Sequence, residues 1–358
     1  MSQGADKIRQ LLKDPKITEI MINGSQDTFL EIGGLKSKID MIFSEEDIND
    51  IIEEFFNKVG KPISYYNPNG DVCLPDGSRM NLITYPLARC GTAITIRKFN
   101  RELHSIEDLI NEGSMTRNMA DFLIACVKGK VNILFSGATG SGKTTTMEML
   151  SFHIPEQERV ITIEDTAELR LHQQNLVPME TRTPDKDGKG EVTLRDLIRN
   201  ALRMRPDRII VGEVRGPEAL DMIQAMSTGH RGTLAVIHGN SPQEITSRLE
   251  TLILSSGIKL PIEEIRRMIG NTLNVIVQQE RYFDGVRRIT HISEARGVER
   301  GEVALQDLFI FRREGRTPDG KIKGKFKTVM RMYPRFFAEF QRLGLLDEKI
   351  FADTRDSL

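Results

Sequence analysis

Residues 137–144, GATGSGKT, combine glycines, a lysine and a threonine in the spacing GxxxxGK[ST]. The motif follows the apolar run Val131 to Ser136 and opens a helical segment, which is the context that a phosphate-binding loop needs. In such a loop the backbone N–H groups curl around a β-phosphate, and the helix N-terminus adds partial positive charge. We therefore predict that ATP is bound by Gly137, Ala138, Thr139, Gly140, Ser141, Gly142, Lys143, Thr144 and Thr145. Lys143 would contact the β/γ oxygens, and the Thr144 hydroxyl would bind Mg²⁺.

Acidic residues end two further apolar runs. RVITIEDTAEL places Glu164 and Asp165 after one run, and RPDRIIVGEVRG places Glu213 in another. Carboxylates at the ends of adjacent parallel strands, beside a phosphate loop, can hold a magnesium shell and polarise a water. We predict catalytic roles for Glu213 and Glu164 and a Mg²⁺ role for Asp165. Solvated strand-end acids remain the alternative, and neither an NKxD base-reading motif nor a kinase-type lid motif stands out.

Two histidines, His230 and His238, bracket the apolar run Thr233 to Ile237 in TGHRGTLAVIHGNSP. They could form a metal pair, a polar relay around a reacting phosphate, or two ordinary surface histidines at strand ends. A metal pair would need further ligands nearby, and the sequence does not suggest them. The three cysteines (Cys73, Cys90 and Cys126) are far apart and lack CxxC spacing, so neither zinc nor a disulfide framework is predicted.

The overall composition excludes several classes of protein. The 358 residues are 39% hydrophobic, which suits a chain of two domains, and 50 Lys+Arg balance 51 Asp+Glu to a net charge of −1. We therefore expect no stable nucleic-acid partner, because such proteins are usually strongly basic. No stretch approaches the roughly 18 apolar residues of a membrane span, and the N-terminus is too charged for a signal peptide. We predict a cytoplasmic protein.

The chain changes character near residue 100. Residues 1–99 predict a small α+β domain, with an amphipathic helix between Ser44 and Gly60 and strands in ITEIMING, DTFLEIGGLK, IDMIF, Arg79 to Thr84 and Ala93 to Phe99. Residues 100–116 are interpreted as a linker with a short helix. Residues 117–358 predict an α/β domain with helices starting near Lys143, Leu194 and Pro217, alternating with strands at Val131 to Ser136, Val160 to Ile163, Arg208 to Val211 and Thr233 to Ile237. This alternation favours a mostly parallel sheet covered on both faces, followed by antiparallel strands joined at Asp284-Gly285.

These motifs together resemble a known family. GATGSGKTTT, ITIEDTAEL, LRMRPDRIIVGEVRGPEALDMIQAMSTGH and TLAVIHGNSP are similar, in order and spacing, to the phosphate loop, aspartate box, Walker B segment and histidine box of the secretion ATPases. Within that superfamily, ITEIMING, LPDGSRMN, ITIRKF and VIVQQERYFDGVRRITHISE resemble the CpaF/TadA branch, the ATPases of tight-adherence (Tad) pili. The resemblance runs from about residue 17 to about residue 312.

The resemblance implies a RecA-like P-loop motor domain with a smaller, PAS-like α+β N-terminal domain, assembled into a homohexamer. It implies that His230 and His238 sense the γ-phosphate, and that Arg79 and Arg97 of the N-terminal domain reach the phosphates. Three arginines flank Walker B: Arg203, Arg205 and Arg215. We expect Arg215 to matter most for function, through a salt bridge or through contact with a neighbouring subunit. The implied activity is ATP hydrolysis at the inner membrane, as a peripheral protein, to drive pilus assembly or retraction through an inner-membrane platform protein.

Some residues depart from the Tad pattern. HGN stands where that branch usually has HAN, and Arg231 follows His230 where an acidic residue is common. Basic residues at that position occur in type IV secretion and conjugation members, so a traffic ATPase of that kind is the alternative function. The chain starts about sixteen residues before ITEIMING, whereas Tad ATPases usually have a longer N-terminal segment, so we expect a trimmed N-terminus. A RecA-like DNA motor and a small-molecule kinase also stay open.

Overall fold

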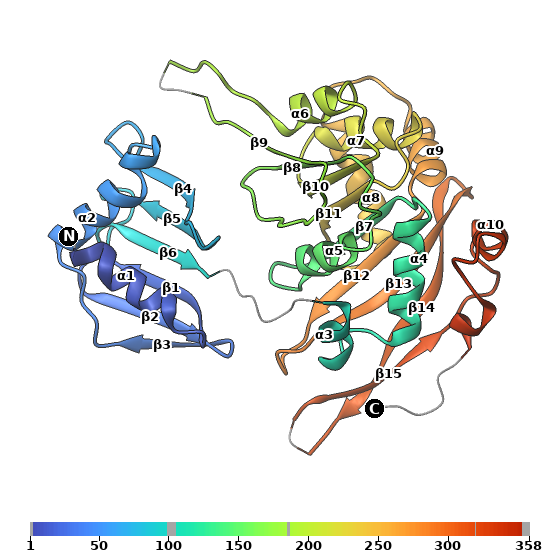
Figure 1. The fold of residues 1–358 in the computed structure, drawn as a ribbon, viewed down its shortest axis with the longest axis horizontal. Coiled ribbons are helices and arrows are strands. Elements are labelled where there is room, and N and C mark those ends of the chain that lie inside the picture. The colour runs from blue at the N-terminus through green and yellow to red at the C-terminus, as the bar shows by residue number, and fades with distance from the viewer. Residues whose placement is uncertain (1–2, 99–104, 185–186, 319, 353–358) are drawn as a thin grey trace. The chain divides into compact units, whose positions relative to one another are not determined.

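The computed structural model describes residues 3–98, 105–184, 187–318 and 320–352 (Figure 1). The chain divides into two compact units. Unit 1 comprises Met1–Glu102 and Pro184–Gly190, and unit 2 comprises Leu103–Thr183 and Glu191–Leu358. Among the described residues, no helix has the length and the apolar composition that crossing a bilayer requires.

The predicted linker, residues 100–116, is only partly described. Residues 100–104 lie outside the described ranges, as does Phe99 at the end of a predicted strand. From Ile106 onward the segment forms helix α3 (Ile106–Asn111), whose Ile106 and Leu109 are buried in a core of unit 2. This helix is therefore packed as part of unit 2.

Unit 1 is a six-stranded sheet with two helices packed on one face. The strand order is β3-β2-β1-β6-β5-β4, and every neighbouring pair is antiparallel. Side chains alternate between the two faces of a strand, so Ile20 and Ile22 of β1 both point into the core beneath the helices. The elements are α1 (Gln3–Lys13), β1 (Ile17–Asn23), β2 (Asp27–Ile32), β3 (Leu35–Ile39), α2 (Glu45–Phe55), η1 (Asn57–Val59), β4 (Asn69–Cys73), β5 (Arg79–Ile83) and β6 (Ala93–Arg97).

Helix α2 begins where the sequence predicts. Ser44 caps it, because its hydroxyl accepts from the backbone N–H of Asp47 while the Asp47 carboxylate accepts from the N–H of Ser44. The helix is shorter than predicted: it ends at Phe55, and the 3-10 turn η1 leads to Gly60, whose φ of +78° is left-handed.

Three elements of unit 1 differ from the sequence-based expectation. The third strand is β3, LKSKI, instead of the apolar run IDMIF; four of its five residues are exposed, so its sequence lacks the alternation that marks a half-buried strand. Phe43 of that apolar run is instead buried in the core just before α2. The patterns did not indicate α1 or β4, because each buries few apolar residues among many polar ones.

Unit 2 contains a nine-stranded sheet in the order β15-β14-β13-β12-β7-β11-β10-β8-β9. Neighbouring strands are parallel from β12 through β9 and antiparallel from β12 through β15. The parallel part and the antiparallel tail both agree with the sequence pattern. The strands are β7 (Ile133–Gly137), β8 (Val160–Glu164), β9 (Leu176–Glu180), β10 (Arg208–Val214), β11 (Leu234–His238), β12 (Val275–Arg281), β13 (Arg287–Glu299), β14 (Glu302–Arg316) and β15 (Ile322–Thr328).

Helices cover both faces of this sheet. Ile133 and Phe135 of β7 point into a core shared with α4 and α5, whereas Leu134 points into the opposite core, shared with α6 through α9. The helices after α3 are α4 (Arg117–Lys128), α5 (Lys143–Ser151), α6 (Leu194–Ala201), α7 (Glu218–Ser227), α8 (Pro242–Leu254), α9 (Ile262–Thr272), α10 (Phe337–Arg342) and η2 (Glu348–Phe351).

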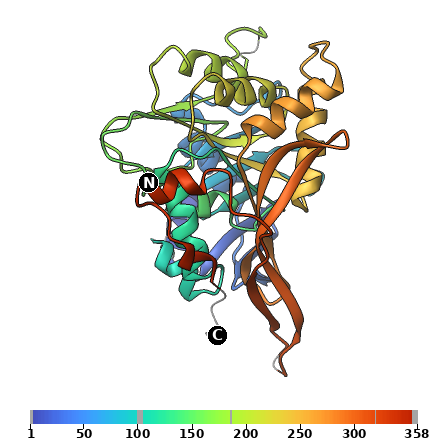
Figure 2. The same cartoon turned by 90° about the vertical axis from the view of Figure 1, so that its right-hand side faces the viewer.

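The C-terminal part of unit 2 has two features of its own. Strands β14 and β15 form a hairpin that extends away from the helices, as Figures 1 and 2 both show. Every second residue of the outer strand of this hairpin, β15, is a lysine, namely Lys323, Lys325 and Lys327, and Lys321 directly precedes the strand. The following segment packs aromatic rings on α4, with Phe336 and Phe351 centred 6.1 and 5.8 Å from Phe122.

Candidate nucleotide-binding site

The phosphate loop joins β7 to α5 at the carboxyl end of a central parallel strand. Strand β7 ends at Gly137, and α5 begins at Lys143. Gly142 has a φ of +95°, a left-handed conformation that other residues rarely adopt. At Gly137, a Cβ would lie 2.2 Å from the carbonyl oxygen of Gln279. Both positions therefore require glycine, and the conformation of the loop depends on them.

Lys143 is held at this loop with only 6% of its surface exposed. Its Nζ donates a hydrogen bond to the carbonyl oxygen of Ala138 at 2.8 Å and lies 3.4 Å from Nδ1 of His238. A buried ammonium group is costly unless polar groups surround it. These contacts keep its charge at the loop, where a phosphate would bind.

His238 and Glu213 continue this chain of contacts on the two neighbouring strands. His238 ends β11 and pairs in the ladder with Gly137, and its Nε2 lies 2.8 Å from Oε1 of Glu213 on β10. Oε2 of Glu213 accepts a hydrogen bond from Nη2 of Arg215 at 2.6 Å. Lys143 of α5, His238 of β11, Glu213 of β10 and Arg215 just after β10 therefore form one continuous polar chain.

The protonation of this chain follows from burial and from its charges. Nε2 of His238 and Oε1 of Glu213 are in close electrostatic contact at 2.8 Å, and Nδ1 of His238 faces Lys143. Burial, then the charge of Lys143, lowers the pKa of His238 below its ordinary value, although Glu213 opposes this. Burial would raise the pKa of Glu213, but the hydrogen bond and charge of Arg215, with the charges of His238 and Lys143, lower it. At neutral pH a neutral imidazole thus faces an ionised carboxylate.

The loop after β10 is fixed by another acid. Oε1 of Glu218, which is 6% exposed, accepts hydrogen bonds from the backbone N–H groups of Arg215 and Gly216, both at 2.6 Å. This contact sets the backbone from which Arg215 reaches Glu213. Arg203 and Arg205, the other two arginines near Walker B, are exposed.

The acids of the aspartate box lie beside this chain of contacts. Glu164 ends β8 and is 4% exposed; its Oε1 accepts from the backbone N–H groups of Glu168 at 3.0 Å and Leu169 at 3.2 Å. Its Cγ lies 2.7 Å from the position of a Cβ on Gly212, so the carboxylate packs directly against the residue before Glu213. Its contacts are those of an acid that shapes the loop after β8.

Asp165 is exposed and accepts a hydrogen bond from Thr181 Oγ1 at 3.4 Å. Its charge adds to the hydrogen bond and charge of Glu213 in raising the pKa of Arg215. Asp165 thus lies near the Arg215 end of the polar chain, and its predicted Mg²⁺ role stays a prediction, as does the catalytic role of Glu164.

His230 lies at the opposite end of β11 from His238. It precedes the strand, where its carbonyl oxygen accepts from Thr233 Oγ1 at 3.0 Å and its Nδ1 lies 3.5 Å from Thr228 Oγ1. Strands β7 and β11 are parallel and the phosphate loop follows the carboxyl end of β7, so His230 stands at the other edge of the sheet from its own loop. The structure does not bring the two histidines together, and the loop of the same chain gives no support to a catalytic role for His230.

Arg79 and Arg97 belong to unit 1. Arg79 begins β5, Arg97 ends β6, and the two are direct partners in the antiparallel ladder. On the other side of β6, Glu19 of β1 lies opposite Arg97. Their contact with phosphates stays a prediction.

Sequence reasoning missed the residues that β12 places beside the loop. Gln279 Oε1 accepts from Thr146 Oγ1 at 3.1 Å, and Gln278 Nε2 donates to the carbonyl oxygen of Gly239 at 3.1 Å. A signal existed in VIVQQER, because two glutamines within an apolar strand must find hydrogen-bond partners when they are buried. Their partners are far away in the sequence, and only the parallel pairing of β12 with β7 brings them together.

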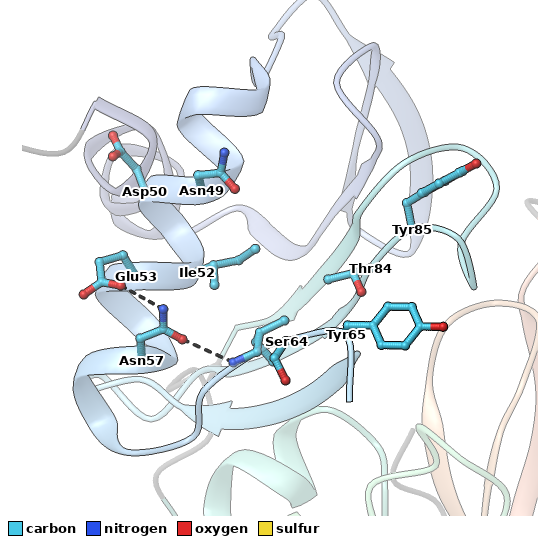
Figure 3. Close-up of a pocket in the computed structure, with 10 residues that line it drawn as sticks. Asn49, Asp50, Ile52, Glu53, Asn57, Ser64, Tyr65, Thr84 and Tyr85 are labelled. Atoms are coloured by element: carbon cyan, nitrogen blue, oxygen red, sulfur yellow. Dashed lines mark hydrogen bonds between the residues drawn. The ribbon is translucent and has the colours of Figure 1, made fainter. Parts of the chain in front are cut away.

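A separate hollow of about 680 Å³ lies in unit 1 (Figure 3). Its lining includes Asn49, Asp50 and Glu53 of α2, with Tyr65, Thr84 and Tyr85 from two loops. Asn57 ties the helix to one of these loops, donating to Glu53 at 2.8 Å and accepting from the backbone N–H of Ile63 at 3.2 Å. None of the predicted site residues lines this hollow.

The residues of the phosphate loop fit a nucleotide with Mg²⁺. Glycines shape the loop, Lys143 supplies a cation, and Ser141 is fully buried with an Oγ that has no hydrogen-bond partner among the described residues. A buried hydroxyl normally has a partner, and a phosphate oxygen is of the right kind. Thr144 is the residue of the motif that would bind Mg²⁺. Within the described ranges, no group of three or more His, Cys, Asp or Glu side chains is arranged to hold a metal by itself.

Comparison with known proteins identifies the family. The sequence model of the family described as type II/IV secretion system protein matches residues 2–290. VirB11 of Agrobacterium fabrum is 32% identical over 298 residues, which cover 75% of this chain and 86% of that protein. An uncharacterised protein of Methanocaldococcus jannaschii is 42% identical over 233 residues, 63% of this chain but only 32% of the relative.

The solved structures include the pilus retraction motor PilT with bound ADP. It superposes with a TM-score of 0.61 at 18% identity and covers 96% of this chain and 87% of its own. This likeness confirms the predicted fold class, a RecA-like α/β motor domain with a smaller α+β N-terminal domain. With a family match over most of its length, a phosphate loop on β7 and a Walker B glutamate beside it, the chain belongs to the type II/IV secretion system ATPase superfamily.

Proposed function

We propose that this chain hydrolyses ATP as a homohexamer and uses the cycle to move pilin subunits through an inner-membrane platform protein, in assembly or retraction of a Tad-type pilus. The observation that carries the proposal is the polar chain from Lys143 through His238 to Glu213, which joins the phosphate loop to an ionised carboxylate on the neighbouring strands. A site that only bound nucleotide would not need a partly buried acid linked to the loop lysine.

Each residue has a role that follows from its chemistry. Lys143 and the loop amides bind the phosphates, and Glu213 orients a water and accepts its proton. His238, neutral at pH 7, connects Lys143 to Glu213, so a change at the phosphates is felt at the carboxylate. Mg²⁺, when bound through Thr144, would neutralise phosphate charge. Arg79 and Arg97 would stabilise the charge that develops during hydrolysis.

Arg215 holds Glu213 through a 2.6 Å hydrogen bond in the described structure. A carboxylate paired in this way has a lowered pKa and is a weaker base. Release of Arg215 would therefore activate Glu213, and ring closure is a natural cause, since the arginine is 60% exposed.

The alternative function is that of a traffic ATPase in type IV secretion or conjugation. It is favoured by the similarity to VirB11, which in Bartonella quintana is named a type IV secretion system protein, and by Arg231 after His230. Both functions use the same nucleotide site. They differ in the partner, which for the Tad role is an inner-membrane platform protein contacted from the cytoplasmic side.

The experiment has two arms. Phosphate release by the purified chain tests hydrolysis, and absence of ATP-dependent release in an assembled hexamer would contradict the proposal. Affinity purification from the native host tests the partner: we expect a pilus platform protein, and recovery of conjugation-channel components in its place would establish the alternative. Genes for pilins and a platform beside this gene would agree with the first result.

A further inference from the structure

Two arginines of unit 2 lie beside the phosphate loop of their own chain. Arg281 ends β12, Arg287 begins β13, and the two are direct partners in the antiparallel ladder. Strand β12 also runs parallel to β7, with Gln279 opposite Gly137, the residue at which the loop starts. The ladder therefore places this pair of arginines just beyond the start of the loop.

Both side chains reach the loop. Nε of Arg287 donates a hydrogen bond to the carbonyl oxygen of Gly140 at 3.2 Å, and its Cδ lies 3.1 Å from where a Cβ on Gly142 would be. Nη1 of Arg281 lies 3.9 Å from the position of a Cβ on Gly140. Two guanidinium groups thus flank the Gly140 to Gly142 part of the loop.

This arrangement concentrates positive charge. Lys143, Arg281 and Arg287 all lie at the N-terminal end of α5, which itself carries partial positive charge. Like charges directly opposite each other on antiparallel strands are destabilising. Arg281 is exposed, and no carboxylate among the described residues forms an ion pair with it. An anion bound at the loop would offset the repulsion.

The turn between the two arginines is rigidly held. The carboxylate of Asp284 accepts from the backbone N–H groups of Val286 at 3.1 Å and Ile322 at 2.9 Å, and from Nη1 of Arg288 at 3.2 Å. The guanidinium of Arg288 also lies over the rings of Tyr282 and Phe311, 5.4 and 5.3 Å from their centroids. Groups fixed in advance lose less entropy when they bind a ligand.

We propose that Arg281 and Arg287 bind the polyphosphate of the nucleotide, as cationic contacts supplied by the same chain that carries the phosphate loop. The proposal rests on the proposed function, because it takes the nucleotide to bind at residues 137–145. Arg281 carries the direct contact to phosphate, and Arg287 holds Gly140 while adding its charge.

The test uses the full-length protein with Arg281→Gln and Arg281→Lys, measuring affinity for ATP, ADP and AMP by titration calorimetry. Loss of a charge-assisted hydrogen bond should weaken ATP binding about tenfold. The loss should be smaller for ADP and smallest for AMP, and lysine should restore part of it. Arg312→Gln is the matched control, because Arg312 is an exposed arginine on β14 of the same sheet. It should leave all three affinities unchanged.

Thermal unfolding without nucleotide separates binding from a structural role. We expect Arg281→Gln to keep or slightly raise the melting temperature, since it removes a like-charge contact, whereas a structural arginine would lower it. Unchanged ATP affinity, or an equal loss for ATP and AMP, would overturn the proposal; the second result would mean that Arg281 contacts the ribose or base. If Lys143→Ala abolishes ATP binding while Arg281→Gln has no effect, only this inference fails. If Lys143→Ala binds ATP normally, the nucleotide site itself is wrong.

Discussion

Each unit of this protein carries a pair of arginines that face each other across an antiparallel ladder. In unit 1 the pair is Arg79 and Arg97, and in unit 2 it is Arg281 and Arg287. In unit 1, Glu19 on the next strand lies opposite Arg97, whereas the pair in unit 2 has the phosphate loop as its neighbour. The same local construction therefore predicts different behaviour: a pair fixed at the loop should affect nucleotide binding, and a pair in another unit should affect turnover, which depends on how the units close.

The comparison requires that the nucleotide binds at the phosphate loop, and Lys143→Ala tests this directly. We expect tight ATP binding to be abolished, because alanine cannot offset the β/γ charge and the neighbouring arginines cannot replace a cation inside the loop. Isothermal titration gives the answer. If Lys143→Ala binds ATP as tightly as the wild type, the nucleotide does not bind at the phosphate loop. The expected difference between the two arginine pairs would then lose its basis, because neither pair would be beside the nucleotide.

Glu213→Gln supplies a reference for a pure turnover defect. The amide keeps the shape of the side chain and can still meet His238 and Arg215, but it cannot accept a proton from water. We expect ATP affinity to stay within a few-fold and steady-state hydrolysis to fall on the order of 10²- to 10⁴-fold, the usual range for general-base catalysis. Turnover close to that of the wild type would move the base role to Glu164.

Arg97→Ala is the variant that most sharply separates the two pairs. If Arg97 acts from unit 1 on a closing ring, turnover should fall at least about tenfold, a conservative floor for an arginine finger, while ATP affinity changes only a few-fold. The measurement is hydrolysis against protein concentration, with light scattering in parallel to follow assembly into a hexamer. Specific activity that stays flat down to a demonstrated monomer contradicts ring-dependent catalysis. A large loss of ATP affinity would make Arg97 a binding residue like Arg281.

The smallest expected effect is a pH dependence at His238, which faces Lys143, Glu213 and Arg215. Burial and the charge of Lys143 lower its pKa, so the imidazole is neutral at pH 7 and takes up a proton only below its ordinary value of about 6.5. Protonation adds a second cation beside Lys143. Turnover should therefore decline a few-fold as the pH falls through this lowered pKa.

The free energy of unfolding should also decrease as the pH falls below about 6.5, because the unfolded chain, with the higher His238 pKa, takes up the proton first. A pH–rate profile of His238→Gln is the control: the amide does not titrate, so its profile should be flatter than that of the wild type. A wild-type profile that stays flat to low pH would show that His238 does not link the loop to Glu213.

Local motifs predicted the class of the fold, and three-dimensional register decided the rest of the site. The strand-loop-helix context of GATGSGKT and the acids after two apolar runs predicted a parallel sheet with a phosphate loop, and both are present. His230 and His238 stand at opposite ends of β11, because His230 precedes the strand and His238 is its last residue, and the catalytic role of His230 stays a prediction. The position of Arg281 and Arg287 beside the phosphate loop could not be predicted, because no local sequence pattern indicates that β12 pairs with β7. Helix α1 and strand β3 lack the apolar periodicity on which the predictions relied.

The lysines of β15 matter for how the molecule meets its own copies. Strand β15 is the outer strand of a nine-stranded sheet, and such an edge presents backbone groups that can pair with the edge of another chain. Ammonium groups at every second residue make two such edges repel each other, which protects against fibre formation at high local concentration. For the proposed ring, an edge that does not pair with another β-sheet would favour closed assembly over open-ended β-sheet polymerisation.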